Sequence, residues 1–352
     1  MATKTISKAG LSALVRDLLS AGTRVVAPVR RREPDPGGVE YAELTSPDQM
    51  CLDGPQPSRS LKEWIFPPSE PLFCWRQTGS EIQLDPAPTA YPETVVVGAR
   101  PCDAAALEIL DRVMGWDYRD EPWFGRRQAT LLLVLACQQC DDSCFCTAVG
   151  LSPTSRRGAD CFLTKAGDGF SVDPITPRGQ ALLDRFPAHF GEAPAAAARE
   201  ADGLEQKVRS NLSARPDRIR GWLETHFDDP LWKRLALRCH GCGACAFVCP
   251  TCHCFDIVDE PDGNDRGTRR RSWDTCQTAL FTLHTSGHNP RPDQAARYRQ
   301  RLLHKFAVYP ARFDEVLCTG CGRCVRVCPA GMDLVEILAE IDRAAEAPGG
   351  PR

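Results

Sequence analysis

The chain has 352 residues, of which 42% are hydrophobic and 25% charged, and its net charge is −3. This composition is typical of a globular protein with its own core, and the length suggests two domains. The charge argues against a nucleic-acid-binding or polybasic membrane-surface protein. The apolar stretches are too short to insert into a bilayer. The chain has 19 cysteines and begins without an apolar secretory segment, so we expect metal-ligating thiols in the cytoplasm.

The first half predicts helices alternating with strands. Residues 11–20 place apolar side chains at helical spacing, and residues 24–29 follow as a strand. Residues 33–60, rich in Pro, Gly, Asp and Ser, predict loops with short strands. A strand at 94–97, a helix from about Asp103 and a buried strand within 129–137 then predict an α/β unit with adjacent parallel strands.

Both buried strands of this unit end in cysteine. Cys102 follows the first, and Cys137, Cys140, Cys144 and Cys146 follow the second. Ligands collect at the carboxyl ends of strands in open α/β sheets, so these thiols are expected to meet. Their spacing alone leaves three interpretations open: a metal-cluster site, a zinc site, or small buried hydrophobic residues.

The second half predicts a mainly helical domain. Residues 187–204 predict a connector that passes into helix, and the helical pattern begins near residue 206. We therefore expect an α+β fold of two domains, an α/β domain at 1–205 and a helical, ferredoxin-like domain at 206–352. The long separation of the two cysteine runs in the second domain predicts an inserted arm.

The two cysteine runs both read C-x2-C-x2-C-x3-C-P. They contain Cys239, Cys242, Cys245 and Cys249, and then Cys318, Cys321, Cys324 and Cys328. This is the ligand spacing of bacterial ferredoxins, whose thiolates hold [4Fe-4S] clusters, and the last cysteine of each run ligates the other cluster.

We therefore predict two ligand sets that exchange their last members. The first set is Cys239, Cys242, Cys245 and Cys328, and the second set is Cys318, Cys321, Cys324 and Cys249. A zinc-stapled interaction module is the alternative, because C-x2-C pairs also bind zinc.

The order of the motifs resembles a known iron–sulfur family. RPCD, CFC, the first cysteine run, SWDTC, RYRQRLLHKF and the second run follow one another between about residues 60 and 335. This arrangement is similar to the iron–sulfur β subunit of soluble [NiFe] sulfhydrogenases and equally to the iron–sulfur subunit of anaerobic sulfite reductases. The resemblance implies a third [4Fe-4S] cluster on Cys102, Cys137, Cys144 and Cys146, the third set, with Cys140 as an additional thiol.

The resemblance also implies a function. It predicts an electron-transfer subunit between a [NiFe] hydrogenase module and a flavin- and NAD(P)-binding subunit, with a sulfite reductase catalytic subunit as the alternative to the hydrogenase. The chain has neither a dinucleotide-binding fingerprint nor a phosphate-binding loop, so no active site of its own is evident. A self-contained enzyme that binds flavin or substrate near Cys102 is an alternative of another class.

The remaining candidates have simpler interpretations. Asp103 and Asp274 are expected to cap helices. Cations near the runs could stabilise an anionic cluster: Arg271, Arg297, Arg301, His304 and Lys305. The other cysteines are expected to be inert or to pack in the core: Cys51, Cys74, Cys161, Cys252, Cys254 and Cys276.

Overall fold

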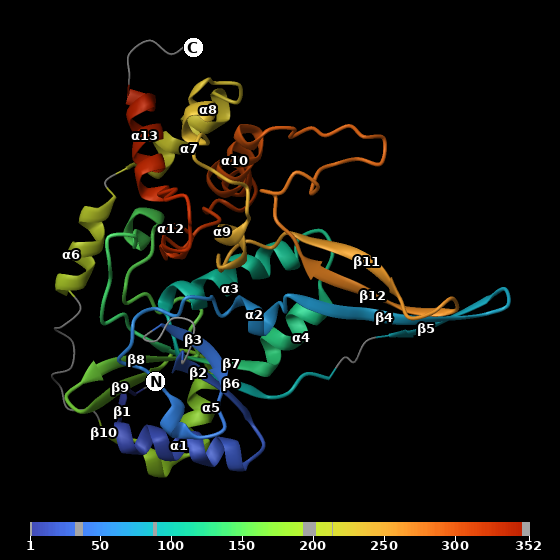
Figure 1. Cartoon of the computed structure of the whole chain (residues 1–352). Coiled ribbons are helices and arrows are strands. Elements are labelled where there is room, and N and C mark those ends of the chain that lie inside the picture. Colours follow the sequence, from blue (N-terminus) through green and yellow to red (C-terminus); the bar gives the residue numbers. More distant parts are fainter. Residues whose placement is uncertain (1, 32–37, 87–89, 193–201, 213, 347–352) are drawn as a thin grey trace.

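The computed structural model describes residues 2–31, 38–86, 90–192, 202–212 and 214–346. Its central element is an eight-stranded sheet in the order β10-β1-β9-β8-β7-β6-β2-β3 (Figure 1). The strands are β1 Lys4–Ser7, β2 Arg24–Arg30, β3 Val39–Glu43, β6 Thr94–Ala99, β7 Thr130–Leu135, β8 Cys161–Ala166, β9 Gly169–Pro174 and β10 Gly191–Glu192. The strands β2, β6, β7 and β8 are parallel neighbours, and the other pairs are antiparallel.

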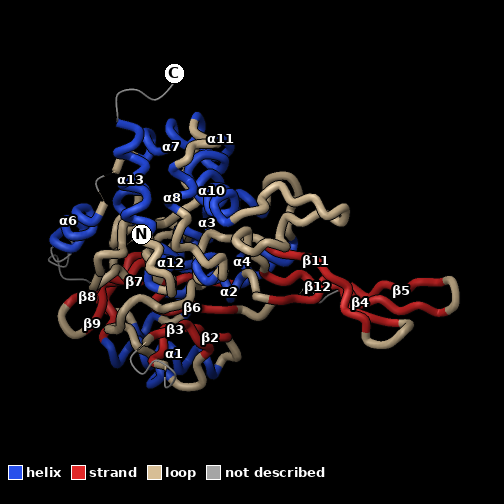
Figure 2. Tube along the Cα trace, turned by 45° about the horizontal axis from the view of Figure 1, so that its top comes forward, coloured by secondary structure: helices blue, strands red, loops and turns tan. Residues whose placement is uncertain are grey.

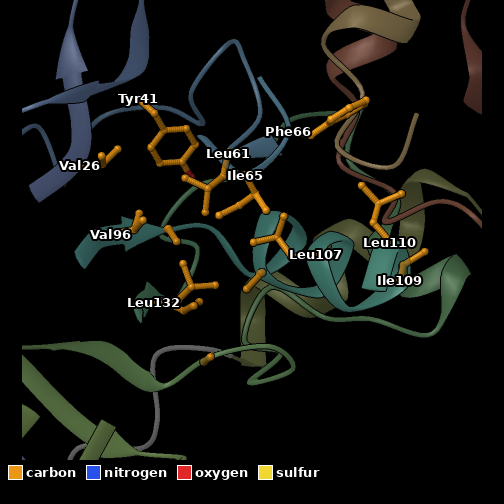
Figure 3. Packing of buried hydrophobic residues seen from close by; sticks show 14 of the residues in the cluster. Val26, Tyr41, Leu61, Ile65, Phe66, Val96, Leu107, Ile109, Leu110 and Leu132 are labelled. Atoms are coloured by element: carbon orange, nitrogen blue, oxygen red, sulfur yellow. The ribbon is translucent and has the colours of Figure 1, made fainter. Parts of the chain in front are cut away.

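Helices cover both faces of this sheet. One face carries α1 Lys8–Ser20 and α5 Pro177–Arg185, and the other carries α2 Lys62–Ile65, α3 Pro101–Met114 and α4 Glu121–Ala129. Successive strand side chains point to opposite faces. Val95 therefore packs in the core with Leu14 of α1, whereas Val96 packs in the core with Leu107 of α3 (Figure 3).

The elements predicted in the first half are confirmed. The helix at 11–20 lies within α1, and the predicted strands correspond to β2, β6 and β7. The helix expected from Asp103 begins at Pro101, because proline fits the first helical position without losing a hydrogen bond. Residues 33–37 of the predicted loop region lie outside the described residues, and the remainder contains β3 and the short helix η1 Pro47–Gln49.

The second half forms a helical layer beside the sheet. Its helices are α6 Asp202–Asn211, α7 Pro216–Thr225, α8 Leu231–Leu235, α9 Ala244–Phe247, α10 Gln294–Leu303, η4 His304–Val308, α11 Tyr309–Phe313, α12 Arg323–Arg326 and α13 Leu334–Glu346. Trp222, Leu302 and Ile341 share its core with Phe145, which precedes the short helix η2 Cys146–Val149. A segment of the first half therefore belongs to the helical core. Of the predicted connector at 187–204, residues 193–201 lie outside the described part, and η3 Pro187–His189 precedes them.

A second sheet forms an arm that extends away from the rest of the molecule (Figure 2). Its strands are β4 Ser69–Thr78, β5 Glu81–Pro86, β11 Phe255–Pro261 and β12 Arg266–Trp273, in the order β11-β12-β4-β5. One hairpin comes from each side of the domain boundary expected near residue 205, and that boundary stays a prediction.

The three arginines at 269–271 of the arm are paired with carboxylates. Arg271 is 5% exposed and binds Glu70 and Asp120. Arg269 and Arg270 pair with acidic residues of β11. Each arginine of the run is therefore paired with a carboxylate of this chain.

Three cysteines that were expected to pack in the core behave differently from one another. Cys161 and Cys51 are buried, but Cys74 lies on β4 of the arm and is exposed, so its assignment to the core was wrong.

None of the helices in the described ranges has the length and apolar character that a membrane span requires.

Candidate cluster-binding sites

The two cysteine runs adopt the same local structure. In the first run Gly243 has φ 76° and precedes the short helix α9, which carries Cys245. In the second run Gly322 has φ 73° and precedes α12, which carries Cys324. Glycine adopts this left-handed conformation without steric cost, so each run can turn sharply between its second and third cysteines.

The first set surrounds one pocket. Its lining includes Cys239, Cys242, Cys245 and Cys328, so the last cysteine of the second run has joined three cysteines of the first. Gln294 donates a hydrogen bond to the Sγ of Cys239 at 3.2 Å, and the backbone N–H of Met332 donates to the Sγ of Cys328 at 3.3 Å. Donors directed at sulfur favour the thiolate, which is the form that binds iron.

The second set lies deeper, around Lys305. The Nζ of Lys305 lies 3.4 Å from the Sγ of Cys249, the last cysteine of the first run. Burial raises the pKa of Cys318 to about 12 and that of Cys324 to about 11. Lys305 lowers the pKa of Cys318, and Cys249 and Cys324 raise it. The nearby cation therefore offsets part of the cost of burying thiolates.

The third set lines another pocket, at the carboxyl ends of β6 and β7. Cys102, Cys137, Cys144 and Cys146 all contribute to this pocket. Cys140 is a fifth thiol of the same pocket, and it lies near both Cys137 and Cys144. The parallel pairing of β6 with β7 brings together thiols that are far apart in the sequence.

Side-chain donors also reach the sulfurs of the third set. Gln56 donates to the Sγ of Cys102 at 3.1 Å, and Arg326 donates to that of Cys144 at 3.2 Å. Arg326 extends from α12 in the second run, so that run contributes a charge to the third site.

The second and third sets are in direct contact. Cys321 lines the pocket of the third set, and its thiol lies near that of Cys102. The carbonyl of Gly320 accepts a hydrogen bond from the N–H of Phe145 at 2.8 Å. A Cβ atom on Gly320 would lie 2.5 Å from the backbone of Cys146, so this approach requires glycine.

Replacing Gly320 by alanine is expected to separate these two loops. The substitution combines a left-handed backbone, which costs a non-glycine residue about 1–2 kcal/mol, with overpacking worth about 1–3 kcal/mol. Gly331→Ala is a matched control, because its φ of 62° is close to the 61° of Gly320, while among the described residues only Arg238 lies near its Cβ, at 3.9 Å. Chemical denaturation of both variants should show a larger loss of stability for Gly320→Ala. Equal losses would contradict the close approach.

A buried ion pair fixes the same junction. Both guanidinium Nη atoms of Arg323 bind the carboxylate of Asp103 at 2.7 Å, and the two side chains are 1% and 0% exposed. The hydroxyl of Tyr41 donates to Asp103 at 2.8 Å. Asp103 follows Cys102, and Arg323 precedes Cys324, so the pair joins the two cysteine loops.

The sequence interpretation of Asp103 as a helix cap was therefore wrong. The first turn of α3 has no side-chain cap, and the carboxylate of Asp103 binds Arg323 and Tyr41 instead. Sequence reasoning missed Arg323 and Tyr41. The sequence did contain a signal for this ion pair. An aspartate follows the cysteine of RPCD, and an arginine, of opposite charge, precedes the last cysteine of CGRC.

The side chains present fit anionic iron–sulfur clusters. Arg301 is 4% exposed and lines the pocket of the first set, and its Nε and Nη2 atoms have no hydrogen-bond partner within the described residues. Buried polar groups are normally paired, so these atoms indicate an acceptor of negative charge. In the described ranges, no three His, Cys, Asp or Glu side chains form a group that could hold a single metal ion.

The remaining cysteines and histidines form contacts of their own. The thiol of Cys252 lies near that of Cys249, and the thiol of Cys254 lies near that of Cys276 at the base of the arm. His253 packs against His304 with ring centroids 5.4 Å apart. Burial lowers the pKa of His253 to about 4 and that of His304 to about 3, so both rings are neutral at physiological pH.

Comparison with known proteins adds two findings. Residues 238–332 match the family model of a 4Fe-4S dicluster domain. The chain is 28% identical over 322 residues to the sulfhydrogenase 2 subunit beta of Pyrococcus furiosus, a match that covers 90% of this chain and 92% of that protein. The resemblance expected from the motifs is confirmed, and the 4Fe-4S domain lies in the C-terminal part of a mixed helix and sheet structure.

Proposed function

We propose that this chain is the electron-transfer subunit of an oxidoreductase complex and holds three [4Fe-4S] clusters in a continuous series. The dicluster domain and the similarity to a sulfhydrogenase β subunit support an iron–sulfur electron-transfer role. The observation that carries the series is the contact of Cys321 and Gly320 with Cys102, Phe145 and Cys146.

Each ligand set would hold one cluster. The first cluster would be bound by Cys239, Cys242, Cys245 and Cys328, the second by Cys318, Cys321, Cys324 and Cys249, and the third by Cys102, Cys137, Cys144 and Cys146. A [4Fe-4S] cluster bound there would supply one-electron redox chemistry.

The sets follow one another in the structure. Cys324, a member of the second set, also lines the pocket of the first, and Cys321 lines the pocket of the third. The second set is therefore the middle one. Cys242 of the first set is exposed, whereas Cys318 and Cys249 of the second are buried. This arrangement favours electron exchange with a partner at the first set and protection from water in the middle.

The partners would be subunits that supply and accept electrons. We infer a [NiFe] hydrogenase module and a flavin- and NAD(P)-binding subunit, because the similar protein is named as the β subunit of a sulfhydrogenase. The alternative partner is the catalytic subunit of an anaerobic sulfite reductase. Affinity purification from the native host under anaerobic conditions, followed by mass spectrometry of the retained chains, distinguishes them.

Iron and sulfide analysis tests the central proposal. Protein isolated anaerobically should contain about twelve irons and twelve acid-labile sulfides per chain and give paramagnetic signals after reduction with dithionite. About eight irons would reject the third cluster. Colourless protein that contains only zinc would identify a zinc-stapled module, and bound flavin in the isolated chain would favour a self-contained enzyme.

A further inference from the structure

Arg301 is a buried cation whose hydrogen-bonding capacity is only partly accounted for. It lies on α10 with 4% of its surface exposed. Neither Nε nor Nη2 has a hydrogen-bond partner in the part of the chain that the structure describes. Leaving guanidinium N–H groups unpaired in the interior is strongly unfavourable, so this position requires an acceptor.

The charge of Arg301 is maintained by its surroundings. Burial opposes the charge, but negative charge on the neighbouring sulfurs of Cys245, Cys324 and Cys252 raises the pKa of Arg301 well above its ordinary value. Cys245 belongs to the first set and Cys324 to the second, and both line the pocket that Arg301 also lines. Arg301 therefore lies within electrostatic reach of both sets.

The other cations near the cysteine runs are already engaged. Lys305 donates to Cys249, to Thr251 and to the carbonyl of Leu317. Arg297, one turn earlier on α10, donates to the side chain of Gln294 and to two backbone carbonyls. Arg271 is held in the arm by Glu70 and Asp120. Of the cations that the sequence singled out, Arg301 is the one with buried guanidinium donors that have no partner within the described residues.

We infer that Arg301 is a positioning residue that donates hydrogen bonds from Nε and Nη2 to the anionic cluster of the first set and, through its charge, favours the reduced state at both the first and the second site. This inference rests on the proposed function. Reduction at either site adds one electron and one negative charge, with no bond formed or broken. A nearby fixed cation stabilises the added charge, which raises the midpoint potential.

The test is a redox titration of the full chain, purified anaerobically and monitored by electron paramagnetic resonance with dithionite as reductant. In Arg301→Gln, both midpoints should fall, so that the ratio of reduced to oxidised cluster at a fixed potential decreases about tenfold, or about 59 mV for a one-electron couple. Arg301→Lys keeps the charge and should shift both midpoints less. Arg299→Gln is the matched control on the same helix, because Arg299 binds Asp228 and the carbonyl of Phe227, and it should leave both midpoints in place.

Iron analysis of each protein separates the possible failures. Wild-type protein without iron would overturn the proposed function itself. Full iron content with unchanged midpoints in Arg301→Gln would overturn only this inference. If Arg301→Gln loses iron, the iron content and the midpoints of Arg301→Lys test the inference. Retained iron with midpoints close to those of the wild-type protein supports the inference, because the charge is kept. Midpoints lowered by about 59 mV or more, or loss of iron from the lysine variant as well, overturn it, because the charge is then not sufficient.

Discussion

Replacing Cys328 by serine is expected to abolish the cluster of the first set while leaving that of the second set assembled. Cys328 lines the pocket of Cys239, Cys242 and Cys245, although it belongs to the second cysteine run. Serine removes the thiolate on which the fourth iron corner depends. The iron content should fall from about twelve to about eight per chain, and one set of paramagnetic signals should disappear.

The pattern of lost signals identifies the exchange of ligands. Cys328→Ser should lose the same signal as Cys242→Ser, which changes an exposed member of the first run. Cys249→Ser should lose the same signal as Cys321→Ser. Cys74→Ser, on the exposed arm, is a control that should retain all signals. If Cys328→Ser and Cys321→Ser lose the same signal instead, each run closes its own cluster and the exchange is wrong.

Local sequence pattern predicted the elements that bring the cysteines together. The apolar run at 129–137 and the strand at 94–97 predicted β7 and β6, and their parallel pairing places Cys102 and Cys137 at one edge of the sheet. The repeated spacing of the two runs predicted that Cys328 would join Cys239 in one pocket, as it does. In both cases a regular sequence pattern, the apolar strands in one and the repeated cysteine spacing in the other, determines where the thiol lies.

Contacts between distant segments could not be predicted in this way. Gly320 lies against Cys146, and the arm pairs β4 with β12, yet neither contact has a periodic signal in the sequence. The charge of Asp103 was visible, but its partner Arg323 is 220 positions away. Local sequence predicts that an aspartate at the start of a helix caps it. In the folded protein, Asp103 pairs with the distant Arg323 instead.

Replacing Asp103 by asparagine is expected to destabilise the protein by about 3–5 kcal/mol, because it leaves Arg323 charged and uncompensated in the interior. Chemical denaturation of the anaerobically purified protein measures this loss. Arg234→Gln is the control. It removes an ion pair with Glu340 in which Arg234 is 70% exposed, and exposed pairs contribute at most about 1 kcal/mol.

A double variant separates the ion pair from the space that it fills. In Asp103→Asn with Arg323→Met, neither residue of the pair is charged and Tyr41 can still donate to the amide oxygen, so part of the stability should return. Losses that simply add would show that the two side chains act independently. Since Asp103 is adjacent to Cys102 and Arg323 to Cys324, the single variant should also alter the signals of the second and third sets. Unchanged signals would mean that the pair stabilises the fold without positioning the cysteine loops.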